Sequence, residues 1–275
     1  MRLVSRNRLG QISVSAITTA DGRRARNIAL IVASASALAA QAPQAETAAD
    51  APPPQLLKKI ALREEQTARL RDNYTYRQSV TIEEFDGIGK VVGVYHEVRD
   101  ITFSPKGERY EDVVEKPRST LHRLILTEED FADIRNVQPF LLTPEQLFSY
   151  EYKFQGEEMM QGERCFIVFI RPRQLLSGQR LFEGTLWVRI QDLSVVRSEG
   201  QAVPQIMTTK QENLFPHFTT IRRPVDGEWF FPVETFGDDT LFFRTGPQRV
   251  RIRIRYSDYK KFGSDSTVKF GETDK

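Results

Sequence analysis

Cysteine is almost absent from this sequence of 275 residues, since Cys165 is its single example. One cysteine cannot form a disulfide within the chain. Cys165 lies in the apolar run RCFIVFIRP, and a reactive thiol needs basic or polar neighbours. The sequence therefore predicts a thiol buried in a strand, where it behaves as a small apolar side chain.

Histidine is also scarce, and the three histidines are far apart at His96, His122 and His217. None belongs to the H-x-x-x-H or H-E-x-x-H spacing that places two metal ligands on one helix face. The G-x-S-x-G motif of serine hydrolases and the glycine-rich phosphate-binding loops are missing too. These absences argue against a metal site, a bound cofactor and nucleotide chemistry.

Two adjacent carboxylate pairs remain as candidates for acid–base chemistry. Glu128–Glu129 follows a threonine and favours a helix start, where negative charge complements the helix dipole. Asp238–Asp239 is typical of a turn. Neither pair indicates a general acid and base, so we expect that the protein is not an enzyme.

A strong excess of one charge is missing once the N-terminus is set aside. Residues 1–45 hold six arginines and one acidic residue, Asp21, so that 33 basic residues face 36 acidic ones in the remainder. A nucleic-acid-binding surface needs a basic excess. We therefore expect no nucleic-acid partner.

The sequence has no hydrophobic run long enough for a spanning helix. Its apolar segment Ile28–Ala40 is short, rich in alanine and serine, and preceded by the basic stretch GRRARN, which is typical of a signal peptide. We assign residues 1–42 to a signal peptide with extra N-terminal residues, and an uncleaved anchor helix is the alternative. No cysteine comes directly after the segment, so we expect a periplasmic or secreted protein that is neither lipid-anchored nor integral to the membrane.

Composition divides the rest of the chain into three parts. Residues 43–55, rich in Pro, Ala and acid, predict a disordered linker, and residues 264–275 a flexible tail. Residues 56–263 are expected to form one domain. That domain begins with an amphipathic helix over 56–73, which carries Leu56 and Ile60 on its inner side and Glu64 on its outer side.

Alternation with a period of two predicts that the domain is mainly β-structure. Three strands joined by the turns DGIG and SPKG are expected in 74–117, and short helices at 127–136 and 143–150 follow threonine caps. The remaining strands are expected at 150–158, 164–171, 181–190, 194–203, 217–223, 228–236, 240–244 and 248–260. About eleven antiparallel strands rarely stay flat, so the fold class is α+β, with a curved sheet or incomplete β-barrel covered by a few helices.

Trp187 is unusual because it lies among polar residues. In FEGTLWVRI (182–190) the even-numbered residues are apolar or glycine, and Trp187 alternates with them. It therefore lies on the opposite face of the strand, where it either pairs with aromatic neighbours across strands or offers a docking point to a partner.

The hairpin that contains Trp187 carries a family resemblance. The motif has three parts. It begins with Gly184, Leu186, Trp187 and Val188 and continues with the partner strand DLSVVR. Its third part is Asp226, Gly227, Trp229 and Pro232 in PVDGEWFFPVETF. It resembles the LolA/LolB-like lipoprotein-sorting superfamily over residues 57–262. Arg189 stands where that superfamily has an acidic residue. The resemblance implies a curved, incomplete barrel with helices over its concave face and an apolar cavity.

The favoured hypothesis is a non-enzymatic periplasmic binding or carrier protein whose cavity takes an acyl chain or a lipoprotein-like ligand. Residues that alternate toward the inner face of the sheet are the expected cavity lining: Val80, Ile82, Leu186, Val188, Ile190, Phe231, Ile252 and Ile254.

The alternative is a structural or sensory module of the cell envelope that has a filled core and binds a protein partner through its outer surface. Its surface would consist of Trp187, the loop ENLFPHF (212–218) and four arginines on one face of the last strand. These four form the arginine row: Arg249, Arg251, Arg253 and Arg255. We expect the row either to pair with acids of the neighbouring strand, such as Glu234 or Asp239, or to face anionic partners.

Overall fold

A computed structural model describes residues 51–262 except 105–106, 138, 177–179 and 208–211. All of these residues belong to the compact unit Thr47–Lys275. The predicted signal peptide at 1–42 and tail at 264–275 lie outside the described residues, as does most of the linker at 43–55.

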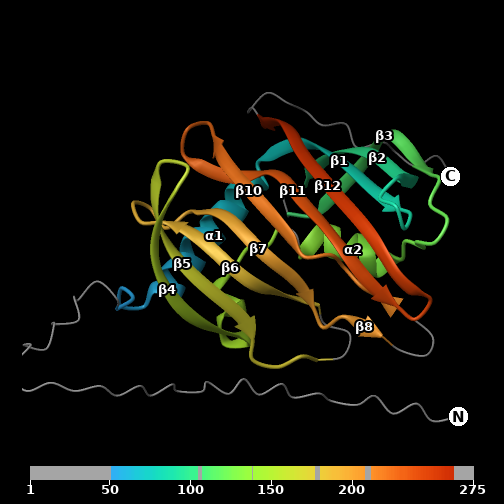
Figure 1. Cartoon of the computed structure of the whole chain (residues 1–275). Helices are drawn as coiled ribbons and strands as arrows, with labels where there is room; N and C mark the ends of the chain where they lie inside the picture. The colour runs from blue at the N-terminus through green and yellow to red at the C-terminus, as the bar shows by residue number, and fades with distance from the viewer. Residues whose placement is uncertain (1–50, 105–106, 138, 177–179, 208–211, 263–275) are drawn as a thin grey trace, which may run out of the picture. The chain divides into compact units, whose positions relative to one another are not determined.

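A ten-stranded antiparallel sheet dominates the described chain (Figure 1). Its order is β3-β2-β1-β12-β11-β10-β7-β6-β5-β4, so the last strand pairs with the first in the interior of the sheet. The strands of this sheet are β1 (Tyr74–Phe85), β2 (Val91–Phe103), β3 (Arg109–Ser119), β4 (Tyr150–Met160), β5 (Glu163–Pro172), β6 (Leu181–Arg189), β7 (Val195–Val203), β10 (Phe218–Val225), β11 (Trp229–Phe243) and β12 (Gly246–Lys261).

The sheet stays open, because β3 and β4 each have one neighbour in it. Two short strands, β8 (Ile206–Met207) and β9 (Glu212–Asn213), form a separate pair that the sequence did not predict. The expected curved, incomplete barrel is thus confirmed, with ten strands in the main sheet.

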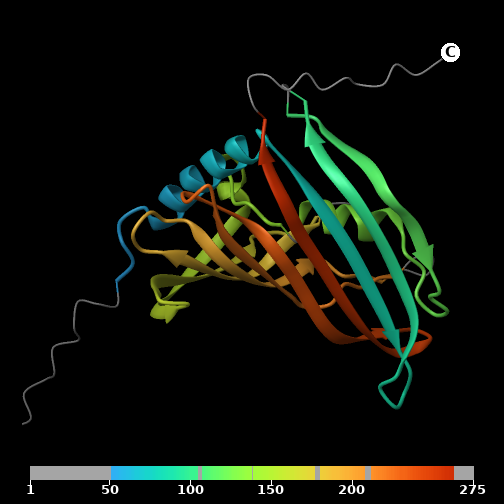
Figure 2. The same cartoon turned by 90° about the horizontal axis from the view of Figure 1, so that it is seen from above.

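Helices lie on the concave side of the bent sheet (Figure 2). They are α1 (Leu56–Arg71), α2 (Glu128–Asn136) and the short 3₁₀ helix η1 (Pro144–Ser149). The predicted threonine caps are confirmed, since Thr127 and Thr143 both form capping boxes with the third residue of their helix. Leu56 and Ile60 of α1 are fully buried against the sheet, as their spacing predicts.

The prediction that Glu64 lies on the outer side of α1 was wrong. Glu64 is 1 % exposed, and it follows Ile60 by four residues, which places it on the same face of the helix. Its carboxylate accepts a hydrogen bond of 2.7 Å from Arg222 of β10, which is also 1 % exposed. A buried charged partner on a distant strand is therefore the reason that a glutamate occupies this face.

The predicted turn at Asp238–Asp239 was also wrong, because β11 continues through it as one strand. Gly237 pairs with Ile252, and Asp238 with Arg251, of the 16-residue strand β12. The long partner strand supplies main-chain hydrogen bonds throughout, and its arginines compensate the acids that would otherwise favour a turn.

One large cluster of buried side chains joins the concave face of the sheet to the helices. A second, small cluster lies apart from it and consists of Cys165, Val196 and Phe230, with Met160 and Trp187 packed against it.

Cys165 is 0 % exposed, so the predicted buried thiol is confirmed. Burial raises the pKa of this thiol to about 11, which keeps it protonated near neutral pH.

Candidate functional site

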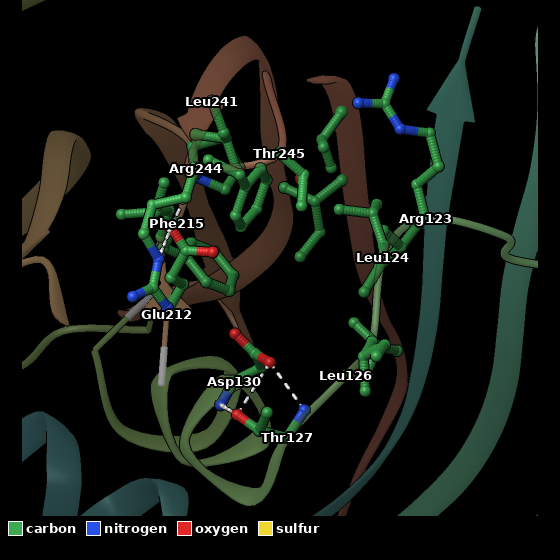
Figure 3. A pocket seen from close by; sticks show the side chains of 17 residues that line it. Arg123, Leu124, Leu126, Thr127, Asp130, Glu212, Phe215, Leu241, Arg244 and Thr245 are labelled. Carbon is green, nitrogen blue, oxygen red and sulfur yellow. Dashed lines mark hydrogen bonds and ion pairs between the residues drawn. The ribbon is translucent and has the colours of Figure 1, made fainter. Parts of the chain in front are cut away.

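A cavity of about 370 Å³ lies at one end of the sheet, where β1, β11 and β12 meet the segment before α2 (Figure 3). Its volume falls at the lower end of the range of about 300–1,000 Å³ that is usual for small-molecule sites. Eleven of its seventeen lining residues are apolar. The lining consists of Ile82, Arg123, Leu124, Ile125, Leu126, Thr127, Asp130, Glu212, Leu214, Phe215, Pro216, Leu241, Phe243, Arg244, Thr245, Val250 and Ile252.

The sheet supplies one wall of this cavity. Ile82 of β1 pairs directly with Ile252 of β12, and both are at most 4 % exposed. Val250 and Leu241 extend the same concave face toward the end of the sheet. These side chains face inward because strand residues alternate, while the arginines between them face outward.

The opposite wall is the strap, which we define as residues 121–127. The carboxylate of Glu84, at the end of β1, holds it in place. One oxygen of Glu84, Oε2, accepts hydrogen bonds from the backbone N–H groups of His122, Arg123 and Leu124 at 3.2, 2.9 and 3.0 Å. Glu84 is 0 % exposed, and charged acceptors form stronger hydrogen bonds than neutral ones. The strap is therefore fastened to the sheet through its backbone, which leaves its side chains available to the cavity.

A glycine lets the start of the strap approach the sheet. A Cβ atom added to Gly93 of β2 would lie 2.7 Å from the carbonyl oxygen of Thr120 and 2.9 Å from Cα of Leu121. Any larger residue would push the strap away. Gly93 and Glu84 thus fix the position of the strap from neighbouring strands.

Polar groups form the floor of the cavity, beneath the start of α2. Asp130 accepts hydrogen bonds from the backbone of Thr127 at 2.7 Å and from the side-chain amide of Asn213 at 2.8 Å. Behind it, Arg180 bonds Asp133 at 2.8 Å. Burial raises the pKa of Asp130, and it raises the pKa of Asp133 to about 6 against the opposing attraction of Arg180.

Charged side chains mark the rim of the cavity. Arg244 donates to Glu212 both from its backbone, at 2.8 Å, and from its guanidinium, at 3.2 Å. Arg123 extends toward the β11–β12 turn, and its Nη2 lies 3.9 Å from the position that a Cβ would take at Gly246. Figure 3 shows Asp130 at one side of the cavity and Arg123 at the other.

Of the predicted cavity residues, Ile82 and Ile252 line this cavity. Five others, Val80, Leu186, Val188, Ile190 and Ile254, belong to or pack against the large buried cluster on the concave side. Phe231 is fully buried and stacks edge-on with Tyr74 at 5.1 Å between ring centres. All of them except Ile82 and Ile252 are outside the set of residues that line the cavity.

The strap and the 214–216 segment are the parts of the cavity that the sequence reasoning missed. Both connect regular elements, so neither shows a helical or strand period. The signal that could have found the strap is composition, since Leu124, Ile125 and Leu126 form an apolar run within a segment that connects regular elements.

The prediction that the loop ENLFPHF (212–218) belongs to the outer surface was wrong for its apolar residues. Leu214 and Phe215 are 6 % and 5 % exposed and line the cavity. The sequence placed this loop outside because it lies between strands, whereas its hydrophobic side chains turn inward onto the open end of the sheet.

The arginine row is paired with acids of the neighbouring strands. Asp238 forms ion pairs of 2.8 Å with Arg249 and with Arg251. Glu83 forms an ion pair of 3.1 Å with Arg251. The carboxylate of Glu234 lies 3.3 Å from the guanidinium of Arg253 and 3.9 Å from that of Arg255. Glu234 is thus a partner as predicted, and Asp238 takes the place expected for Asp239.

Trp187 lies on the outer face and is half-buried. The guanidinium of Arg197 lies 4.6 Å from its ring centre, and its indole N–H donates to Glu158 at 2.6 Å. The side chain also packs against the small cluster around Cys165. These contacts favour the structural interpretation of this residue.

No group of three or more His, Cys, Asp or Glu side chains within the described residues is arranged to hold a metal ion. Among the helices of this part of the chain, none combines the length and apolar character that a membrane crossing requires.

No protein-family model and no curated protein matches the chain. Among solved structures, it is similar to a DUF1329 family protein from Desulfovibrio piger, at 15 % identity and a TM-score of 0.41, covering 78 % of this chain and 96 % of that one. A LolA superfamily protein from Nitrosomonas europaea follows at 13 % identity, a TM-score of 0.35 and coverage of 75 % and 94 %.

A third structure is a Vibrio parahaemolyticus domain named for outer membrane lipoprotein sorting, with 11 % identity, a TM-score of 0.34 and coverage of 77 % and 95 %. At these identities and scores, the function has to be argued from the cavity itself.

Proposed function

We propose that this chain is an exported, non-enzymatic binding or carrier protein that holds an acyl chain or a similar apolar ligand in the cavity beneath the strap. The observation that carries the proposal is the lining of this space. Leucine, isoleucine, valine and phenylalanine side chains from the sheet, the strap and the 214–216 segment surround it. Apolar surface is more stable away from water. An apolar ligand that displaces water from this cavity is therefore stabilised by roughly 25 cal/mol for each Å² of apolar surface buried.

The walls of the cavity are held in place by hydrogen bonds within the chain. The strap is bonded to Glu84, and the floor is held by the pair Asn213–Asp130. A binding site that exists before its ligand arrives avoids the entropic cost of ordering it. This supports binding as the role of the cavity.

Export is the second part of the proposal. It depends on the basic and apolar pattern of residues 1–42, which is typical of a signal peptide, and it assigns the mature protein to the periplasm or the exterior. The expected partners are a lipid or lipoprotein ligand and a protein of the cell envelope.

Ligand binding is tested by expressing the full chain in a bacterium and purifying it from the periplasmic fraction for native mass spectrometry and lipid extraction. A bound apolar molecule is expected on the native protein. The variant Leu241→Trp, which fills the cavity, should lose it, whereas Leu62→Trp on the exposed part of α1 adds the same bulk elsewhere and should keep it. An unliganded protein that also binds no added lipid would contradict the proposal.

An envelope interaction module is the second candidate, and one observation favours it. The concave face over β5, β6 and β7 is packed, with Leu186, Val188 and Val168 all at 0 % exposure. Charge reversal of Arg251 and Arg253 to glutamate separates the two functions. A carrier keeps its ligand in this double variant, whereas a module that acts through its outer face loses its protein partner in a pull-down.

A further inference from the structure

Charge is distributed unevenly around the cavity. Four charged residues line it, namely Arg123, Asp130, Glu212 and Arg244. Glu212 and Arg244 form an ion pair of 3.2 Å, so their charges largely compensate each other. Asp130 is buried and bonded to Thr127 and Asn213. Only Arg123 is left without a polar partner for its guanidinium among the described residues.

The position of Arg123 is nevertheless fixed at the backbone. Its N–H donates to Glu84 at 2.9 Å, so the strap carries this side chain at a constant place on the rim. The guanidinium reaches the β11–β12 turn near Gly246, where Thr245 and Arg244 also line the cavity. The rim at this turn therefore presents a cation that no other described residue pairs with, and a hydroxyl group, next to an apolar space.

The carboxylate of Asp130 on the floor makes the two ends of the cavity electrostatically different. An anionic group that entered deeply would approach Asp130 and lose its hydration, and both effects oppose entry. An anionic group at the rim would instead stay partly hydrated and would meet Arg123. A guanidinium binds carboxylate or phosphate oxygens through two parallel hydrogen bonds, which suits a small oxyanion.

From this arrangement we propose that the ligand is a single-chain amphiphile with an anionic head, whose hydrocarbon chain enters the cavity while its carboxylate or phosphate binds Arg123 at the rim. This inference rests on the proposed function and names the class of ligand. The volume of about 370 Å³ suits one chain better than a lipid with several. Free fatty acids and single-chain phosphate esters share this chemistry.

The test measures dissociation constants of the full chain, after delipidation, for dodecanoate, dodecyl phosphate and dodecanol at pH 7.4. The three probes have the same chain and differ in the head. The anionic probes are expected to bind about threefold to tenfold more tightly than dodecanol, as for a partly exposed ion pair. This preference should shrink in 0.5 M salt, because salt screens exposed charges.

Arg123→Gln is expected to abolish the preference and leave dodecanol binding unchanged, and Arg123→Lys to restore part of it. Arg118→Gln on β3, outside the cavity lining, is the matched control and should keep the preference. The tighter of the two anionic probes identifies whether the head is a carboxylate or a phosphate.

Equal binding of anionic and neutral probes by the native protein, or a preference that survives in Arg123→Gln, would overturn this inference and leave the proposed function intact. Failure to bind any of the three probes would overturn both. The two failures are thus distinguishable within one series of titrations.

Discussion

Glu64 and Arg222 form an ion pair that is almost completely removed from water. Each side chain is at most 2 % exposed, and the guanidinium also donates to the carbonyl oxygen of Phe140. Burial raises the pKa of Glu64, and the positive charge of Arg222 opposes this rise. Two charges in such a place compensate each other, but neither is tolerated alone.

Replacing one member of this pair is therefore expected to be costly. Arg222→Met should lower the free energy of unfolding by about 3–5 kcal/mol, because it leaves the carboxylate of Glu64 buried without its partner. The double variant Glu64→Leu with Arg222→Met should recover most of the loss. Urea denaturation measures both, and Arg255→Met, which removes an exposed pair of 3.9 Å with Glu234, should cost less than about 1 kcal/mol.

The raised pKa of Asp133 should make the free energy of unfolding depend on pH. Its pKa in the folded protein is about 6, against a model-compound value of 3.8, so the folded state binds this proton more tightly than the unfolded chain does. The free energy of unfolding should consequently fall as pH rises from about 4 to about 6, and the contribution is constant above that range.

The measurement compares the native protein with Asp133→Asn by denaturation at several pH values. The difference in stability between the two should change by on the order of 1–3 kcal/mol across this window, in favour of the native protein at low pH. A difference that is independent of pH would show that Asp133 titrates normally.

At the scale of elements, alternation predicted the strands well where one face is buried and the other is not, as in β1 and β6. Strand β6 follows the expected pattern residue by residue, and the capped starts of α2 and η1 were also found. The fastening of the strap could not be predicted, because it depends on a carboxylate, Glu84, that lies 38 residues away from His122. The same holds for Glu64, whose partner is 158 residues away.

Two glycines allow β6 and β7 to approach each other closely. Gly184 pairs with Gly200, and a Cβ added to Gly184 would lie 2.2 Å from the carbonyl oxygen of Glu199 and 2.6 Å from the ring of Phe182. Gly184→Ala is therefore expected to destabilise the protein by about 1–3 kcal/mol.

Thermal denaturation tests this prediction, with Gly87→Ala as the control. Gly87 has no atom within 4 Å of the position of an added Cβ, so this variant should unfold near the native temperature. Equal effects of the two substitutions would contradict the role assigned to Gly184.

The fastening of the strap can be measured by hydrogen exchange. Glu84→Gln removes the charge that accepts three backbone N–H groups, and hydrogen bonds to charged acceptors contribute about 1.5–3 kcal/mol. The amide protons of residues 122–124 should exchange at least tenfold faster in this variant. Glu83→Gln, whose side chain faces outward and bonds Arg251, should leave their exchange unchanged, and protection that persists in Glu84→Gln would exclude the carboxylate as the anchor.

At the scale of the whole folded unit, the concave side of the sheet divides into two parts. Over β5 to β7 it is filled by side chains of the large buried cluster, and at the end of β1, β11 and β12 it holds the cavity. Sequence periodicity showed which residues face inward, but it could not show where the helices leave space. For that reason it predicted Ile82 and Ile252 together with six residues that lie outside the cavity lining.

The proposed function requires that the space beneath the strap takes a hydrocarbon chain. A crystal structure of the protein with a dodecanoate that carries bromine at its terminal carbon tests it most directly, because anomalous scattering locates the bromine atom. We expect the bromine among Leu126, Phe215 and Ile252, with the carboxylate near Arg123. Bromine found only on the outer face, or a cavity closed by its own side chains at saturating ligand, would contradict it.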